Sequence, residues 1–224
     1  MGVYPSVRSY LPLFSQTFEG RVSHMYLDIK GLVTVGVGNL IDPVELALAL
    51  PFRFKNLPGT PADRAQIAAE WQALKSDRGL AEKGARACAP LTGLELSDDA
   101  IDALIAQRAA EDEESLKRQP QFANFEAWPA DAQLALLSMV WALGPGGVAG
   151  FRKLSAACQA LDFHTAAAEC EISEDGNAGV VPRNAANRAL FQNAAHVRAV
   201  EASGGPLHST LFYPKVLTRP VPVG

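Results

Sequence analysis

Two carboxylic acids and a hydroxyl group near the start of the chain have the chemistry of an acid–base site. Glu19 follows a segment in which Phe14 and Phe18 recur at helical spacing, and burial against such rings would favour the protonated carboxyl group that a general acid needs. Asp28 and Thr34 lie in a stretch with strand character, where a more open position favours an ionised carboxylate. Two carboxyl groups held in opposite protonation states are the pair used in glycoside hydrolysis. With 24 acidic residues in the chain, a chance pairing is the competing interpretation.

A small β-sheet is predicted to position Asp28 and Thr34. The residue types in 26–28 and 32–38 alternate with the period of two that is typical of a β-strand, and the intervening Ile29-Lys30-Gly31 favours a turn. We therefore expect Tyr26 to share a face with Asp28. We also expect Thr34, Gly36 and Gly38 to form one face, where two bare backbone positions would let a flat sugar ring approach closely.

The rest of the chain reads as helical. An amphipathic segment covers residues 9–20, Thr60 with Pro61 is a candidate start for a helix that buries Trp71, and Ser97 is a candidate cap for the next helix. An apolar helix is predicted from Pro129 to a stop at Gly144. Further helices are expected over residues 148–161, 163–171 and 183–202. The fold class is therefore α+β, with a small N-terminal sheet, a larger helical body and a ligand cleft expected between them.

Composition excludes several classes of protein. The chain has 224 residues, 48% of them apolar, and no uninterrupted apolar run approaches the roughly 20 residues that span a bilayer. A net charge of −4 argues against binding to nucleic acid. Neither the histidines nor the cysteines (Cys88, Cys158 and Cys170) have metal-binding or redox spacing, so we expect reduced core thiols, no metal and no organic cofactor.

Three ordered blocks of sequence closely resemble the phage-type lysozymes, glycoside hydrolase family 24, which includes the T-even phage lysozyme and related endolysins. The first block has Glu19-Gly20, Tyr26-Leu27-Asp28, Gly31 and residues 34–40, at the spacing of that family's Glu-Gly, Tyr-x-Asp, Gly, Thr-x-Gly-x-Gly-His motif. The second runs from Ala135 to Gly144 and continues with residues 147–151, Gly-Val-Ala-Gly-Phe. The third is Asn187-Arg188-Ala189. The resemblance covers about residues 10 to 200 and implies a lysozyme-like fold of two lobes.

The resemblance implies a role for each matching residue. Glu19 would be the general acid, Asp28 would hold or activate the attacking water, and Thr34 would help to position it. Arg188 would lie near the catalytic glutamate, and Trp141 would line the cleft; a helix-surface position and plain core packing are the respective alternatives. The other implied substrate-binding residues are Tyr26, Gly36, Gly38, Asn39 and Leu40.

The chain departs from the family pattern in three places. Asn39 replaces the usual histidine, a stretch at about residues 45–95 reads as an insertion, and the proline-containing tail at residues 204–224 has no counterpart. We expect residues 1–203 to form one catalytic domain in two lobes. The two added segments leave the substrate preference less defined than the catalytic class.

The leading hypothesis is a muramidase that cleaves the β-1,4 bond between N-acetylmuramic acid and N-acetylglucosamine in bacterial peptidoglycan. A lytic transglycosylase is an alternative, although it would not need the water-handling Asp28 and Thr34. A non-catalytic wall-binding module is another.

The expected place of action is the cell wall, reached from the cytoplasm without a signal peptide. A phage or prophage endolysin released by a holin would meet this expectation, as would a secreted antibacterial effector with an immunity protein as partner. Residues 61–130 hold 13 acidic and 8 basic groups, and such acidity modestly favours the effector. We expect a monomer.

Overall fold

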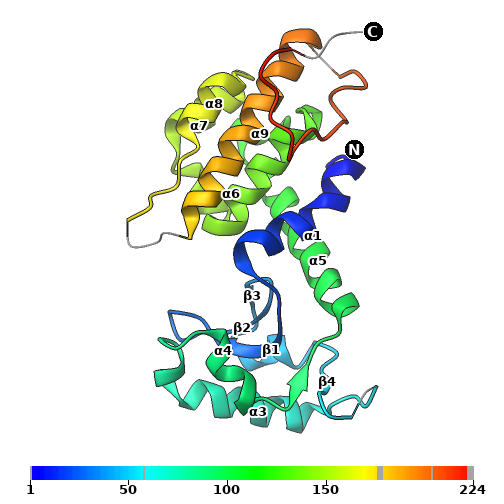
Figure 1. The fold of residues 1–224 in the computed structure, drawn as a ribbon, viewed down its shortest axis with the longest axis vertical. Helices are drawn as coiled ribbons and strands as arrows, with labels where there is room; N and C mark the ends of the chain where they lie inside the picture. Colours follow the sequence, from blue (N-terminus) through cyan, green and yellow to red (C-terminus); the bar gives the residue numbers. More distant parts are fainter. Residues whose placement is uncertain (1, 58, 176–178, 203, 221–224) are drawn as a thin grey trace. The chain divides into compact units, whose positions relative to one another are not determined.

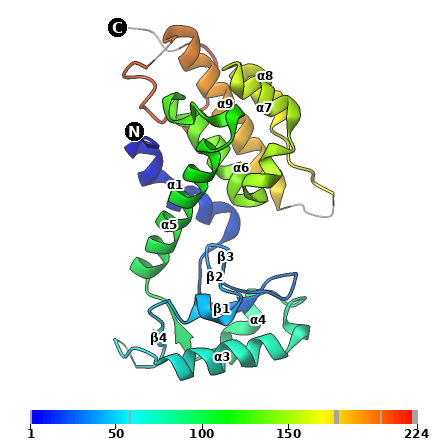
Figure 2. The same ribbon diagram turned by 180° about the vertical axis from the view of Figure 1, so that it is seen from behind.

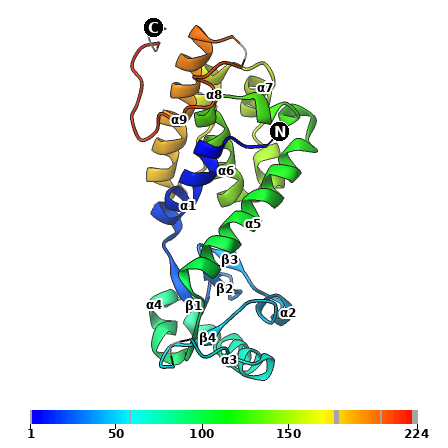
Figure 3. The same cartoon turned by 90° about the vertical axis from the view of Figure 1, so that its right-hand side faces the viewer.

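The computed structural model describes residues 2–57, 59–175, 179–202 and 204–220 (Figures 1–3). The chain divides into two compact units. The sheet unit is Glu19–Gln107, and the helical unit combines Met1–Phe18 with Arg108–Gly224. The structure is mixed, with a small sheet and a mostly helical body, so the α+β prediction is confirmed at this level.

A three-stranded antiparallel sheet opens the sheet unit, in the order β1 (Val22–Leu27), β2 (Val33–Gly36) and β3 (Asn39–Leu40). Tyr26 on β1 pairs with Thr34 on β2, and Thr34 pairs in turn with Leu40 on β3. The turn between β1 and β2 is held by Asp28, whose Oδ1 accepts hydrogen bonds from the backbone N–H groups of Lys30 (2.9 Å) and Leu32 (2.8 Å). An aspartate that bonds the backbone just beyond it is a common way to close a tight turn. The predicted sheet and turn are confirmed.

The segment expected as an insertion completes the sheet unit. A second, two-stranded sheet pairs β4 (Arg53–Phe54) with β5 (Leu94–Glu95). Helices α3 (Arg64–Ser76) and α4 (Ala85–Cys88) lie against β1 (Figure 1). The remaining elements are α2 (Val44–Ala47), η1 (Arg78–Leu80), η2 (Ala89–Leu91) and the first half of α5 (Asp98–Lys117).

The start of α3 was predicted wrongly. Asp63, not Thr60, caps this helix, and its side chain and that of Gln66 bond each other's backbone N–H groups in a capping box. Pro61 lies outside the helix because it pairs with Arg53 in a β-bridge. The buried face was predicted correctly: Trp71 is buried, and its indole N–H donates to the carbonyl of Ile41 at 2.9 Å.

The helical unit is built around α6 (Ala130–Ala149), which packs on α9 (Val180–Val200) (Figure 2). Every residue from 130 to 141 is buried, and each fully buried leucine or valine contributes roughly 1.5–3 kcal/mol. The predicted stop at Gly144 is a kink, where φ is 74°, and helical turns resume beyond it. By length and composition, α6 is the one helix among the described residues that could cross a membrane. The sequence did not predict this, because its apolar run is interrupted. Within the 18-residue window that meets this criterion, 61% of residues are buried, as in the core helix of a globular fold.

Shorter elements surround this pair. Helix α1 (Pro5–Glu19) begins earlier than predicted, α7 (Arg152–Gln159) and α8 (Phe163–Glu169) are shorter, and α9 starts at Val180 instead of Arg183. Two 3-10 turns, η3 (Pro120–Phe122) and η4 (Phe125–Ala127), precede α6. The predicted cap of α5 is confirmed, because Ser97 Oγ accepts from the N–H of Ala100 at 3.2 Å. All three cysteines are described; they are buried and form no disulfide.

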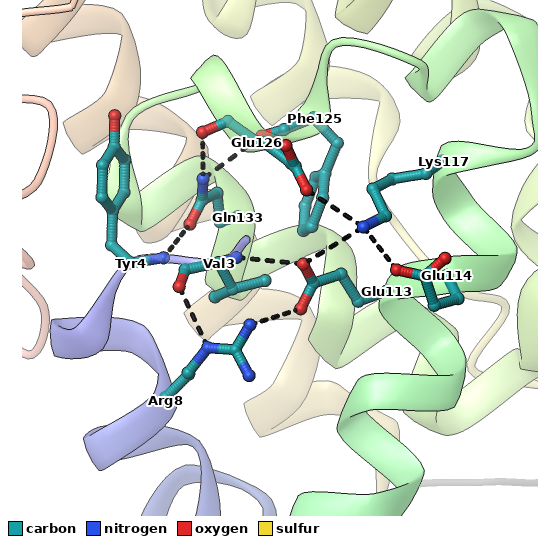
Figure 4. Close-up of polar contacts among 9 residues, drawn as sticks. All are labelled: Val3, Tyr4, Arg8, Glu113, Glu114, Lys117, Phe125, Glu126 and Gln133. Carbon is teal, nitrogen blue, oxygen red and sulfur yellow. Dashed lines mark hydrogen bonds and ion pairs between the residues drawn. The ribbon is translucent and has the colours of Figure 1, made fainter. Parts of the chain in front are cut away.

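Buried polar side chains fix the N-terminal segment (Figure 4). Glu113 on α5 accepts hydrogen bonds from the backbone N–H of Val3 (3.1 Å) and from the guanidinium of Arg8 (2.9 Å). Gln133 on α6 accepts from the N–H of Tyr4 at 3.0 Å and donates to the carbonyl groups of residues 125 and 126. The start of the chain is thereby part of the helical unit.

The tail packs on the helical unit where it is described. Asp131, fully buried on α6, accepts hydrogen bonds from the N–H groups of Phe212 (2.9 Å) and Tyr213 (3.0 Å). Asn193 on α9 accepts from the N–H of Leu217 at 2.8 Å. The sequence left open whether this tail packs on the body or extends away from it; its described residues pack on α6 and α9.

Candidate functional site

Glu19 ends α1, where the chain leaves the helix for β1. Its side chain is exposed, so the expected burial against aromatic rings was wrong. The glycine-containing turn between β2 and β3 comes close to it: a β-carbon at Gly38 would lie 3.7 Å from Glu19 Oε2. Gly38 has a φ of +72°, a conformation that favours glycine, and it leaves the carboxylate facing bare backbone.

Asp28 follows β1 and is half-buried. Its Oδ1 is engaged by two backbone N–H groups, as described above, and this fixes the orientation of the carboxylate. Within the described part of the chain, Oδ2 makes no hydrogen bond or ion pair. One oxygen therefore holds the turn, and the other is available to a ligand or a water molecule.

Tyr26 connects the two acids. Burial, together with the negative charges of Glu19 and Asp28, raises the pKa of Tyr26 to about 12. Electrostatic influence of this kind requires both carboxylates to be near the phenol. Since Tyr26 also pairs with Thr34 across the sheet, all four side chains belong to one small region of the sheet unit.

The face predicted to receive a sugar is partly closed. Thr34 is 4% exposed, and its hydroxyl donates to the carbonyl of Leu32 at 3.2 Å. Gly36 is also buried, and a β-carbon there would lie 3.0 Å from Asn39 Oδ1 and 3.4 Å from a methyl group of Ile101. Gly36 therefore makes room for protein side chains, whereas Gly38 is the half-exposed glycine beside a carboxylate.

Asn39 and Leu40 have different surroundings. The Asn39 side chain is buried, and its Oδ1 accepts from the N–H of Val37 at 3.2 Å, so this group shapes the turn. Leu40 is half-exposed on β3, beside Thr34 in the register of the sheet. Of these two, Leu40 is the residue that a ligand could contact without rearrangement.

Trp141 and Arg188 belong to the helical unit. Trp141 is 4% exposed; the guanidinium of Arg108 lies 4.1 Å from the ring centre and donates to the Trp141 carbonyl at 2.7 Å. Arg188 is half-exposed on α9 and forms an ion pair with Glu171 at 2.8 Å. The Trp141 side chain is thus buried beside Arg108, and the Arg188 side chain is paired with Glu171 on the exposed side of α9.

The buried arginine of α9, Arg183, is not among the site residues predicted from the sequence. Arg183 is 3% exposed, donates to the carbonyl of Ser138 at 3.0 Å, and places its guanidinium 4.8 Å from the ring centre of Phe18. Phe18 directly precedes Glu19. The signal was present in the spacing, because Arg183 lies three, seven and eleven residues before the buried Ala186, Leu190 and Ala194, whereas Arg188 lies on another face.

No cluster of three or more histidine, cysteine, aspartate or glutamate side chains able to hold a metal ion occurs among the described residues. No protein-family model matches this chain, and no curated protein matches it. The sheet unit thus contains two carboxylates in different surroundings. Glu19 is exposed beside Gly38, and Asp28 is held at a turn by two backbone N–H groups. The Thr34 hydroxyl lies on the adjoining strand, β2.

Proposed function

We propose that this protein is a muramidase with a lysozyme-like fold, which hydrolyses the β-1,4 glycosidic bond between N-acetylmuramic acid and N-acetylglucosamine in bacterial peptidoglycan. The main support is the pair of carboxylates, Glu19 and Asp28, that both act on the pKa of Tyr26. Two carboxyl groups flanking one small region are what glycosidic bond hydrolysis requires. The order and spacing of the surrounding sequence motif provide the second support.

Glu19 is the general acid in this proposal. It protonates the glycosidic oxygen as the bond to the sugar breaks, and its exposure at the end of α1 gives a polymeric substrate access to the carboxyl group. Because Gly38 carries no side chain, only its backbone lies beside Glu19 Oε2.

Asp28 and Thr34 handle the attacking water. Two backbone N–H groups orient the Asp28 carboxylate, and its Oδ2 accepts a proton from water and stabilises positive charge on the sugar. The Thr34 hydroxyl donates its own proton to Leu32 and can therefore only accept one from water, which restricts how that water is oriented.

Replacement of Glu19 by glutamine tests the assignment. Glu19→Gln keeps the shape and the hydrogen-bonding capacity but removes the acidic proton, so lysis of purified bacterial walls should fall by roughly 10²–10⁴-fold. Glu45→Gln, an exposed carboxylate on α2 of the same unit, is the matched control and should retain activity. Circular dichroism should show both variants folded. Full lysis by folded Glu19→Gln would refute the assignment.

Mass spectrometry of the digested walls separates hydrolysis from its alternatives. Reducing-end N-acetylmuramic acid products are expected for a muramidase, whereas anhydro products would identify a lytic transglycosylase. Binding to walls with no soluble product would instead identify a non-catalytic module.

A further inference from the structure

A groove of about 710 Å³ opens in the sheet unit, on elements that the proposed chemistry does not use. One wall is the start of β1, residues 20–24, and the other is the turn into α4, residues 83–86, with Ala89. Helix α4 and β1 lie side by side in Figure 1. All of these residues are within the sheet unit.

The groove is cationic in a chain whose net charge is −4. Arg21, Lys83 and Arg86 line it, and none of its lining residues, all of them described, is acidic. Arg21 is held in place by Asp98 (2.9 Å) and Asp102 (2.8 Å). Lys83 and Arg86 are exposed, and neither makes an ion pair with another described residue.

A histidine side chain joins the two walls of the groove. His24 binds the carbonyl of Ala85 through Nε2 at 3.0 Å, which ties the strand to the opposite wall. Burial and the charge of Lys55 lower the pKa of His24, so the ring is neutral at pH 7 and its Nε2 donates this bond. The two walls of the groove are therefore joined by a hydrogen bond, and its rim carries two exposed cations, Lys83 and Arg86, that form no ion pair with another described residue.

We propose that this groove binds the carboxylate groups of the peptide stem that peptidoglycan carries on its N-acetylmuramic acid. This inference rests on the proposed muramidase function. The groove begins at Gly20, the residue after Glu19, so an anion bound there would be close in the chain to the group that protonates the glycosidic oxygen. The stem is covalently attached to one of the two sugars that the cleaved bond joins, and it bears several free carboxylates. Lys83 and Arg86 would pair with those carboxylates and favour peptide-bearing glycan over bare glycan.

The test compares two substrates and two variants. The substrates are intact peptidoglycan and the same glycan after an amidase has removed its peptides. Lys83→Ala/Arg86→Ala removes both rim cations, and Arg118→Ala/Arg152→Ala removes two exposed arginines of the helical unit as the control for net charge. The groove variant should raise KM for peptide-bearing glycan roughly tenfold with little change in kcat, because each exposed ion pair contributes a few-fold to affinity. Its activity on peptide-free glycan should not change, and the control should behave as the wild type.

Direct binding separates failure of the groove from failure of the muramidase assignment. The probe is synthetic L-Ala-γ-D-Glu-L-Lys, titrated into the wild-type chain and followed by NMR. Shifts at residues 20–24 and 83–86 that weaken with salt and in the groove variant would support the groove, even if no wall were lysed. Lysis with an unchanged peptide preference in the groove variant would overturn the proposal. Binding of inorganic phosphate but not of the tripeptide at this groove would also overturn it.

Discussion

Asp112 on α5 should make the protein less stable at neutral pH than at pH 5. The residue is 8% exposed, and its buried Oδ2 has no hydrogen-bond partner among the described residues. The cation facing it is Arg108, whose Nε is 3.8 Å away and which also binds Trp141. Burial raises the pKa of Asp112 to about 6, against the lowering effect of Arg108 and with a smaller rise from Glu111. The carboxylate is therefore ionised at pH 7 at a cost to the folded state.

The sign and size of the effect follow from proton linkage. Between pH 4 and pH 6 the folded chain binds more protons at Asp112 than the unfolded chain does, so the free energy of unfolding falls as pH rises through this window. A pKa raised from 3.8 to about 6 corresponds to roughly 3 kcal/mol if unscreened, and partial solvent access reduces this to about 1–2 kcal/mol. In a chain of this size, that is a difference of about 2–8 °C in Tm.

Asp112→Asn removes the charge and keeps the shape. Thermal unfolding followed by circular dichroism from pH 4 to pH 7.5 should show a higher Tm for the variant at pH 7 and a flatter profile toward acid. Glu82→Gln removes one exposed negative charge from the sheet unit and should leave the profile unchanged. If Asp112→Asn instead lowers Tm at pH 7 by more than it does at pH 4, the Arg108 pair outweighs burial and the prediction is refuted.

Two further substitutions test the tail and the hairpin. Asp131→Ala removes the acceptor for Phe212, Tyr213 and the Asn193 amide, so we expect a loss of about 2–4 kcal/mol in urea unfolding and faster proteolysis of the tail; an unchanged cleavage rate would contradict the packing. Gly36→Ala should cost more stability than Gly31→Ala by roughly 1 kcal/mol, since both have φ near +70° but only the first meets a side chain, Asn39; equal losses would mean that backbone strain alone matters.

Elements with local causes were predicted well. The β1 and β2 alternation, the turn at Asp28 and the cap at Ser97 depend on residues within a few positions of each other, and all are confirmed. The start of α3 was missed because Pro61 pairs with Arg53, eight residues earlier, and no local pattern encodes that bridge.

The burial of the arginines on α9 depends on tertiary packing and not on neighbouring residues. Arg183 and Arg188 are five residues apart on one helix, and only packing of α9 on α6 decides which of them is buried. The motif match identified Arg188 from the sequence, whereas the helical period identifies Arg183 as the buried arginine.

The sequence by itself determined which groups the proposed chemistry would use: Glu19, Asp28 and Thr34, which lie in or directly before one hairpin. The tertiary structure alone decided how each is presented. Glu19 is exposed, Thr34 is buried, and Gly36 is covered by Ile101, which is 65 positions away in the chain. Solvent access depends on such long-range packing, whereas strand alternation and turn formation depend on neighbours. For that reason the residues of the candidate site could be proposed from the sequence, whereas their solvent exposure could not.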